Sequence, residues 1–488
     1  MDPSHSHGSL DPEPANTPLP SPDEEASGPP GGPEAGSPPR PSSGAGPAWS
    51  PAKRFGFRLL AVYFVLYTLP FPVGFVPGLG SVAETAVHQG WDAAAQWVAR
   101  HGLGLEDELF TGPTGSGDTT VDYVRLLMTA VLALAGALAW TLADRRRRRY
   151  EIAPRWLETG CRYYLALTLL SYGLFKVIPV QFSPPSLTRL LTPYGDSSPM
   201  GILWTFMGAS MAYTVFAGLG EVVGAVLLLF RRTRLLGALV SAGVLTNVVV
   251  LNFAYDVPVK LFSSHLLAMA VALIALDGRR LVAFFVRNTP APAANHPPLF
   301  GKRWANVAAR TVGVALVATM VWSTASRAWS TYANRRDGWA SPLRGVHDVE
   351  TFRADGAELA ALTTDELRWR ALVIDSVYPA DEEGGTQRAL VAVQHMDGSL
   401  DRHLVILDEA ARTITWLPEG QPSLEAAEEA GVEVTDVLAY ERPEPDRLVL
   451  RGPWQGRTIE VHLRGRDLST MELTGRGFQW INERPYNR

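Results

Sequence analysis

Four strongly polar residues lie inside apolar runs of the segment 172–280, at depths where lipid would penalise them. Lys176 occurs in SYGLFKVIPVQF, Glu221 in FAGLGEVVGAVLLLF, Asn247 in SAGVLTNVVVLNF and His265 in VPVKLFSSHLLAMAVALIAL. A charged side chain at the centre of a bilayer costs about 2.5–3.5 kcal/mol on insertion scales. A helical bundle that keeps several such residues is therefore a candidate for proton-coupled chemistry, ligand binding or transport.

Glu221 is the sharpest of these candidates. At about 1.5 Å per residue, its separation from the arginines at 231–234 places it near the middle of a bilayer. Gly220 and Gly224 form a pair of small residues four positions apart, which lets a neighbouring helix approach closely. Two interpretations stay open: a hydrogen bond or ion pair between helices, or a group that serves proton- or electron-coupled chemistry or binds a ligand.

Lys176 and His265 complete the predicted catalytic set with Glu221. Lys176 lies toward the outer end of its run, where it can reach the headgroups or pair with Glu221 or with Asp256. Histidine is the side chain that changes charge near neutral pH, so His265 suits proton handling. A histidine that is simply hydrogen-bonded within the core gives the same sequence pattern.

Two loops, 181–204 and 252–260, fall on the same side of the predicted bundle and carry many polar residues. Pro-rich loops at helix mouths commonly line a cavity. We expect these loops to cap the bundle and to form the outer wall of a site whose floor is Glu221. The predicted substrate-binding residues, one of them inside an apolar run, are Gln181, Arg189, Tyr194, Asp196, Asn247, Asn252, Tyr255, Asp256 and Lys260.

Seven apolar runs are long enough, or nearly long enough, to cross a bilayer as helices. They cover about 57–76, 121–143, 161–180, 206–230, 235–253, 259–276 and 307–328. Lys and Arg clusters precede the first run and follow the second, fourth and sixth, so they fall in alternate loops. The positive-inside rule then predicts a cytoplasmic N-terminus and an exported C-terminal part. Residues 82–98 have an amphipathic pattern and are expected to rest on the membrane interface.

Composition divides the 488 residues into unlike segments. We expect a disordered Pro/Gly/Ser-rich tail at 1–54, two transmembrane helices with an outer loop at 55–160, a four-helix bundle at 161–287, a cytoplasmic loop and seventh helix at 288–329, and an exported β-rich domain at 330–488. The single cysteine, Cys161, allows no intrachain disulfide and no cysteine metal cluster, and no metal site is predicted. The arginines at 145–149 follow an apolar run, so they indicate topology and not a nucleic-acid partner.

Short strands dominate the last third of the chain. Alternating or apolar runs at 370–378, 388–396, 403–408 and 413–417, with hairpin turns near 397–398 and 453–456, predict an antiparallel barrel or sandwich. A helix is plausible at 423–430. The terminal segment, 476–488, is predicted as a last strand that seals this domain, or as an arm that docks it onto the bundle mouth. The fold class expected is mainly α and transmembrane, with a C-terminal antiparallel β domain.

Several motifs resemble the DoxX-like family of small bacterial membrane proteins. YGLFK, GLGEVVGAVLLLF and four consecutive apolar runs between residues 162 and 287 carry this resemblance. A larger subgroup of this family, with an exported C-terminal domain, has motifs similar to TPYGDSSPMG, YDVPVKLFSSHLL and the terminal RGFQWINERPYNR. The resemblance implies Lys176 and Glu221 as shared core positions. It also implies a component of a membrane oxidoreductase system that acts with a quinone or a small sulfur species.

Three functions remain open at this point. One is the oxidoreductase component of a bacterial inner membrane, with a redox partner protein. A second is a module that binds or transports a small solute or protons, and a third is a structural assembly protein whose polar core fixes helix register. The sequence contains no evident cofactor motif, although a quinone is compatible with the resemblance. For all three functions the expected partner is the lipid bilayer. A pocket that reaches Glu221 from the membrane plane would favour the first function, and a tightly paired core without a pocket the third.

Overall fold

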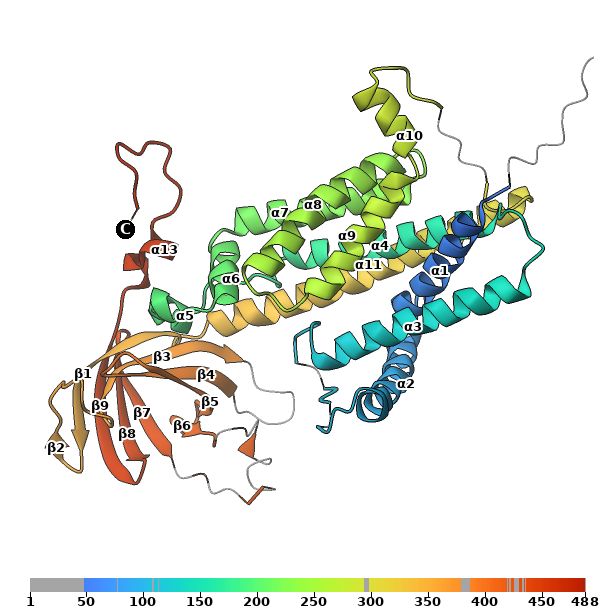
Figure 1. Ribbon diagram of the computed structural model, residues 1–488. Helices are drawn as coiled ribbons and strands as arrows, with labels where there is room; N and C mark the ends of the chain where they lie inside the picture. Colours follow the sequence, from blue (N-terminus) through green and yellow to red (C-terminus); the bar gives the residue numbers. More distant parts are fainter. Residues whose placement is uncertain are drawn as a thin grey trace, which may run out of the picture. The chain divides into compact units, whose positions relative to one another are not determined.

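The computed structural model describes residues 48–488 except 77, 108, 113, 294–297, 379–386, 419, 421–422, 425–429, 432–433, 435 and 488. A helical part is followed along the chain by an antiparallel β domain, which confirms the predicted fold class (Figure 1). The tail predicted at 1–54 lies almost wholly outside the described residues. So does most of the helix predicted at 423–430.

The helical part contains eight helices of sixteen or more residues among the described positions. They are α1 Pro51–Thr68, α2 Leu79–Gly102, α3 Thr120–Ala143, α4 Ala153–Val177, α7 Met211–Leu229, α8 Arg234–Ala254, α9 Lys260–Ala275 and α11 Arg303–Trp339. Shorter elements connect them: η1 Val73–Phe75, α5 Leu187–Leu191, η2 Tyr194–Asp196, α6 Pro199–Ala209, α10 Gly278–Leu281 and η3 Val282–Val286.

Five described segments are long and apolar enough to cross a membrane, namely Pro51–Phe75, α3, α7, α8 and α11. A sixth is added if α9 and Gly278–Val286, which are bent by 67° relative to each other, form one span. The chain therefore has the helices of a multi-pass membrane protein. The predicted third span, α4, is not among them, because Arg162, Lys176 and several tyrosines lower its hydropathy. This helix packs against α1, α7, α9 and α11, so other helices cover much of its surface.

The helix boundaries differ from the predicted spans in three places. The predicted fourth span is divided at Ser210, whose hydroxyl caps α7 by accepting from the backbone N–H of Tyr213. Helix α1 ends at Thr68, before Pro70 and Pro72, although the apolar segment continues to Phe75. The last span continues as one helix to Trp339, well past the predicted end at 328, and so leads into the β domain.

Close approach of two backbones joins α4 to α7. A Cβ atom on Gly218 would lie 2.8 Å from the carbonyl oxygen of Gly173 and 2.7 Å from the Cβ of Lys176. The predicted small-residue pair behaves similarly toward α8, because a Cβ on Gly224 would lie 2.7 Å from the hydroxyl of Ser241. Small residues therefore set the helix spacing in the middle of the bundle, as is common in membrane proteins.

Nine described strands form one antiparallel sheet that closes into a barrel. They are β1 Gly345–Ala354, β2 Ala357–Glu358, β3 Trp369–Tyr378, β4 Gln387–His395, β5 Leu400–Asp408, β6 Thr413–Trp416, β7 Val437–Glu444, β8 Arg447–Trp454 and β9 Arg457–Gly465. Pairing of β1 with both β3 and β9 closes eight strands, and β2 pairs with β1 outside this ring. The barrel alternative is thus the one the chain adopts. Trp369, Trp416 and Trp454 contact one another in its interior.

The predicted last strand at 476–488 is wrong. After η4 Leu468–Thr470 and α13 Glu472–Gly475, the described part of this segment has no regular structure. Phe478, Trp480 and Ile481 are 75%, 89% and 78% exposed. The physical reason is that β9 already pairs with β1, so the closed barrel offers no free edge to a further strand at that position.

The loop after α4 fastens the helical part to the barrel. Both carboxylate oxygens of Asp375 on β3 accept from the first turn of α5, from Leu187 N at 2.9 Å and Thr188 N at 3.3 Å. Leu187 also packs with Val346 and Val373 on the outer side of the barrel. Asp375 therefore caps a helix that belongs to the other part of the molecule.

We predict that Gly218→Ala lowers the melting temperature of the detergent-purified protein. The added methyl group meets the backbone of Gly173, and overpacking of this kind costs about 1–3 kcal/mol. Gly243→Ala on α8 is the matched control, because a Cβ at Gly243 has nothing within 4 Å. Equal melting temperatures for the two variants would show that the α4–α7 contact is not as tight as described.

Candidate functional site

Lys176 and Glu221 form a buried ion pair at the crossing of α4 and α7. The Lys176 Nζ donates to Oε1 and Oε2 of Glu221, each at 2.8 Å. The two residues are only 6% and 4% exposed. Of the partners considered for Lys176, the structure selects Glu221 over Asp256 and over the headgroups. The carboxylate is fully engaged by its cation, so this pair by itself offers no free group to a ligand.

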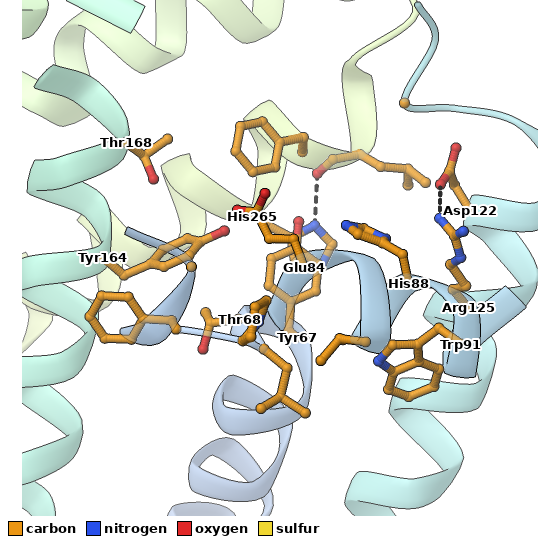
Figure 2. A pocket seen from close by; sticks show the side chains of 18 of the residues that line it. Tyr67, Thr68, Glu84, His88, Trp91, Asp122, Arg125, Tyr164, Thr168 and His265 are labelled. Carbon is orange, nitrogen blue, oxygen red and sulfur yellow. Dashed lines mark hydrogen bonds and ion pairs between the residues drawn. The ribbon is translucent and has the colours of Figure 1, made fainter. Parts of the chain in front are cut away.

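A cavity of about 650 Å³ lies beside this pair. Its walls come from α1 and the turn that follows it, α2, the loop 115–117, α3, α4 and α9 (Figure 2). Tyr172 connects the two features, because its ring lines the cavity and lies 5.7 Å from the Lys176 Nζ. The cavity is thus adjacent to the ion pair without being lined by either of its members.

His265 is the predicted catalytic residue that does line the cavity. Its Nδ1 lies 2.7 Å from the carbonyl oxygen of Leu261, which can only accept, so Nδ1 carries a proton. In the neutral ring Nε2 then accepts from the Tyr63 hydroxyl, 2.6 Å away. The imidazole stacks on Tyr67 with ring centroids 4.1 Å apart. His265 is therefore held in one tautomer and one orientation, with Tyr63 as its proton partner.

Helix α2 contributes polar residues to the opposite wall. Glu84 and His88 are one helical turn apart, line the cavity, and make no ion pair or hydrogen bond with any described residue. Further along, Arg125 of α3 bonds to Asp92 of α2 and to Asp122 at 3.1 Å, which ties these two helices together. The wall therefore combines a fixed charged cluster with two titratable groups that remain without partners.

Aromatic rings make up much of the remaining lining, together with hydroxyl groups. The aromatic members, from four helices and one turn, are Tyr67, Phe71, Phe75, Trp91, Tyr164, Tyr172 and Phe262. The hydroxyls of Tyr67 and Tyr164 make no hydrogen bond to any residue that the structure describes. Figure 2 shows the Tyr164 hydroxyl directed toward the cavity. Tyrosine hydroxyls in such surroundings usually have partners, so a ligand with acceptor oxygens suits this space.

Asp118 sets the position of α9 and therefore of His265. Its carboxylate accepts from the backbone N–H groups of Lys260 and Leu261, at 2.8 and 2.9 Å. These are two of the orphan donors at the start of a helix, and an anionic cap there is favourable. Gly117 adds a backbone bond to the carbonyl oxygen of Pro258 at 2.7 Å. The loop before α3 thus holds the N-terminal turn of α9 against the cavity.

The predicted substrate-binding residues are not part of this cavity. None of the nine lines either cavity described here. Several are used locally: Arg189 donates to Thr205, Asn252 to Ser263, and Lys260 to Asp256. Tyr194, Asp196 and Asn247 are exposed, and Tyr255 is 36% exposed. The buried Oε1 of Gln181 has no hydrogen-bond partner among the described atoms. The residues of the predicted wall therefore lie outside the cavity that α4 borders.

One part of that prediction is confirmed. The loops 181–204 and 252–260 do meet, because Phe182 and Leu203 pack in one apolar cluster with Val257. Their polar residues simply do not converge on Glu221.

Among the described residues, no group of three or more His, Cys, Asp or Glu side chains is placed to hold a metal ion.

Sequence reasoning missed the α1–α2 side of the site. A sequence signal for this side was present, because Tyr63 and Tyr67 are four residues apart, as are Glu84 and His88. This spacing puts each pair on one face of a helix. The amphipathic segment 82–98, which the sequence predicts on the membrane interface, forms part of helix α2, and its residues Glu84 and His88 line the cavity.

We predict strong coupling between Lys176 and Glu221 in a double-mutant cycle. Lys176→Met and Glu221→Gln each leave one buried group unpaired, which typically costs 3–5 kcal/mol. The double variant leaves neither charge behind, so its loss of melting temperature is smaller than the sum of the single losses. Additive losses, measured by thermal unfolding in detergent, would contradict a functional ion pair at this crossing.

Comparison with known proteins adds one relative. No protein-family model matches the chain, and no solved structure matches it. The uncharacterized protein YwoB of Bacillus subtilis (strain 168) is 35% identical over 127 residues, which amount to 25% of this chain and 79% of that protein. At this identity and coverage of the relative, the chain belongs to the same family as YwoB.

Proposed function

We propose that this chain is a component of a membrane oxidoreductase system and binds a quinone in the cavity beside α4. The observation that carries the proposal is the pair of unpartnered hydroxyls, Tyr67 and Tyr164, facing an aromatic cavity of about 650 Å³ between apolar helices. A quinone presents a flat ring with acceptor oxygens and an apolar tail. The aromatic walls and hydroxyl donors of this cavity suit such a ligand.

The residues of the cavity have separate roles in this proposal. Tyr67 and Tyr164 orient the ring by donating hydrogen bonds to its oxygens. Reduction of a quinone adds two electrons and two protons, so that each oxygen forms an O–H bond. His265, hydrogen-bonded to Tyr63, and the unpaired Glu84 and His88 are the groups that supply or accept those protons. The electrons come from a reduced donor outside the chain, either a small sulfur species or a redox partner protein.

Neither cavity is lined by Lys176 or Glu221, so this tightly paired part of the core has a structural role, and support for a quinone comes only from the cavity beside α4. The ion pair joins α4 to α7 and fixes the side of α4 that carries Tyr164 and Tyr172. The resemblance of these segments to DoxX-like proteins supports an oxidoreductase setting. If α4, which packs among the other helices, is counted as a seventh crossing, the alternating Lys and Arg clusters support insertion in the inner membrane, with the N-terminus in the cytoplasm and the barrel outside.

A second function is favoured by one specific observation. Glu84 and His88 line the same cavity and are free of ion pairs among the described residues. Two such groups can hold a proton or a small solute without any redox step. Solute or proton binding is therefore the alternative that the experiment below must separate from quinone binding.

The test is the binding of a short-chain benzoquinone to the purified protein in nanodiscs, followed by quenching of tryptophan fluorescence. We expect Tyr67→Phe and Tyr164→Phe each to weaken binding about three- to tenfold, because each removes one hydrogen bond and little else. Tyr194→Phe is the control, since Tyr194 is exposed and lies outside the cavity. Quinone binding that is absent, or equal in all variants, would sink the proposal; proton uptake that depends on Glu84 alone would favour the alternative.

A further inference from the structure

A second cavity, of about 370 Å³, lies where the end of α11 meets the barrel. It is lined by the loop 183–188, by the end of α11 and the linker after it, and by β3, β4 and β5. Three arginines reach it from different elements: Arg335 from α11, Arg344 from the linker and Arg402 from β5. This cleft plays no part in the quinone proposal.

The cleft has an excess of positive charge. Asp375 is the acidic residue among its lining, and both of its oxygens are already engaged by the backbone of α5. Arg344 uses only Nε, which donates to the carbonyl oxygen of Asp375 at 2.9 Å. Arg335 donates to the carbonyl oxygen of Val180 at 3.4 Å, and Arg402 has no hydrogen bond or ion pair with the described residues. Three guanidinium groups therefore face the cleft with most of their donors unused.

Burial adds to this imbalance. Loss of hydration lowers the pKa of the Arg344 guanidinium, against the smaller effect of Asp375. The cation also lies over the ring of Trp339, 5.7 Å from its centroid. A desolvated cation without a carboxylate partner is unfavourable, and a bound anion would offset that cost.

The position of the cleft along α11 indicates the source of its ligand. The apolar part of this helix ends near residue 328, so Trp339 lies about 16 Å further along at 1.5 Å per residue. The headgroup layer on each side of a bilayer is only about 5–7 Å thick. The cleft is therefore expected above the headgroups, in water.

We propose that this cleft binds a small water-soluble organic anion. Its phosphate or carboxylate group pairs with Arg335, Arg344 and Arg402, whose planar forks match such oxyanions. Its body lies against the rings of Trp339 and Tyr378, which line the same cleft. The site is independent of the membrane cavity and does not require the quinone proposal to hold.

The experiment is calorimetric titration of phenyl phosphate into the full-length protein in phosphatidylcholine nanodiscs. We expect saturable binding with one site, weakened about tenfold or more in both Arg402→Gln and Arg335→Gln, since each removes a charge-assisted interaction. Arg402 is exposed, so its replacement leaves the fold intact. Arg457→Gln, at the exposed start of β9 and outside the cleft lining, is the matched control and should bind like wild type.

Three results would overturn the proposal. One is the absence of saturable binding, and another is an equal loss in the Arg457 control, which would indicate general charge screening. The third result comes from nanodiscs that contain phosphatidylglycerol. If the cleft variants lose association with phosphatidylglycerol but keep phenyl phosphate binding, the cleft binds anionic headgroups and not a soluble anion.

Discussion

Burial of the Lys176–Glu221 ion pair is the constraint on which the helical part depends. Each charge alone would cost several kcal/mol in the low-dielectric interior, so the two must meet with good geometry. They can do so because Gly173 and Gly218 let the backbones of α4 and α7 touch at the same level. This fixes α4 in the centre, against α1, α7, α9 and α11. Tyr164, Thr168 and Tyr172 of α4 then form one wall of the aromatic cavity.

Local patterns in the sequence were enough to predict the helices and most barrel strands, because apolar length and alternation report directly on burial. They also identified Lys176, Glu221 and His265. They could not show that His265 faces Tyr63 and Tyr67, since that contact depends on how α1 and α9 pack, some 200 positions apart. The expected wall of polar loop residues failed for a similar reason. Their partners, such as Thr205 for Arg189 and Ser263 for Asn252, are close in sequence and consume them locally.

The two parts of the chain are joined by polar contacts as well as by the continuous helix α11. Asp375 of the barrel caps α5, and Arg335 of α11 donates to the end of the turn after α4. The same junction holds the arginine cleft, while the aromatic cavity lies among the helices. A lipid-soluble ligand and a water-soluble anion would thus occupy chemically different sites on one protein, both bordered by α4 or by the loop that follows it.

Photoaffinity labelling with an azido-quinone in native membranes, followed by mass spectrometry of the labelled peptides, would show whether a quinone occupies the cavity beside α4. We expect labelling on the segments that line the cavity, 66–75, 84–91 and 259–265, and loss of this labelling when unmodified quinone is added in excess. Labelling confined to lipid-exposed positions such as Phe216 on α7, without competition, would contradict this expectation.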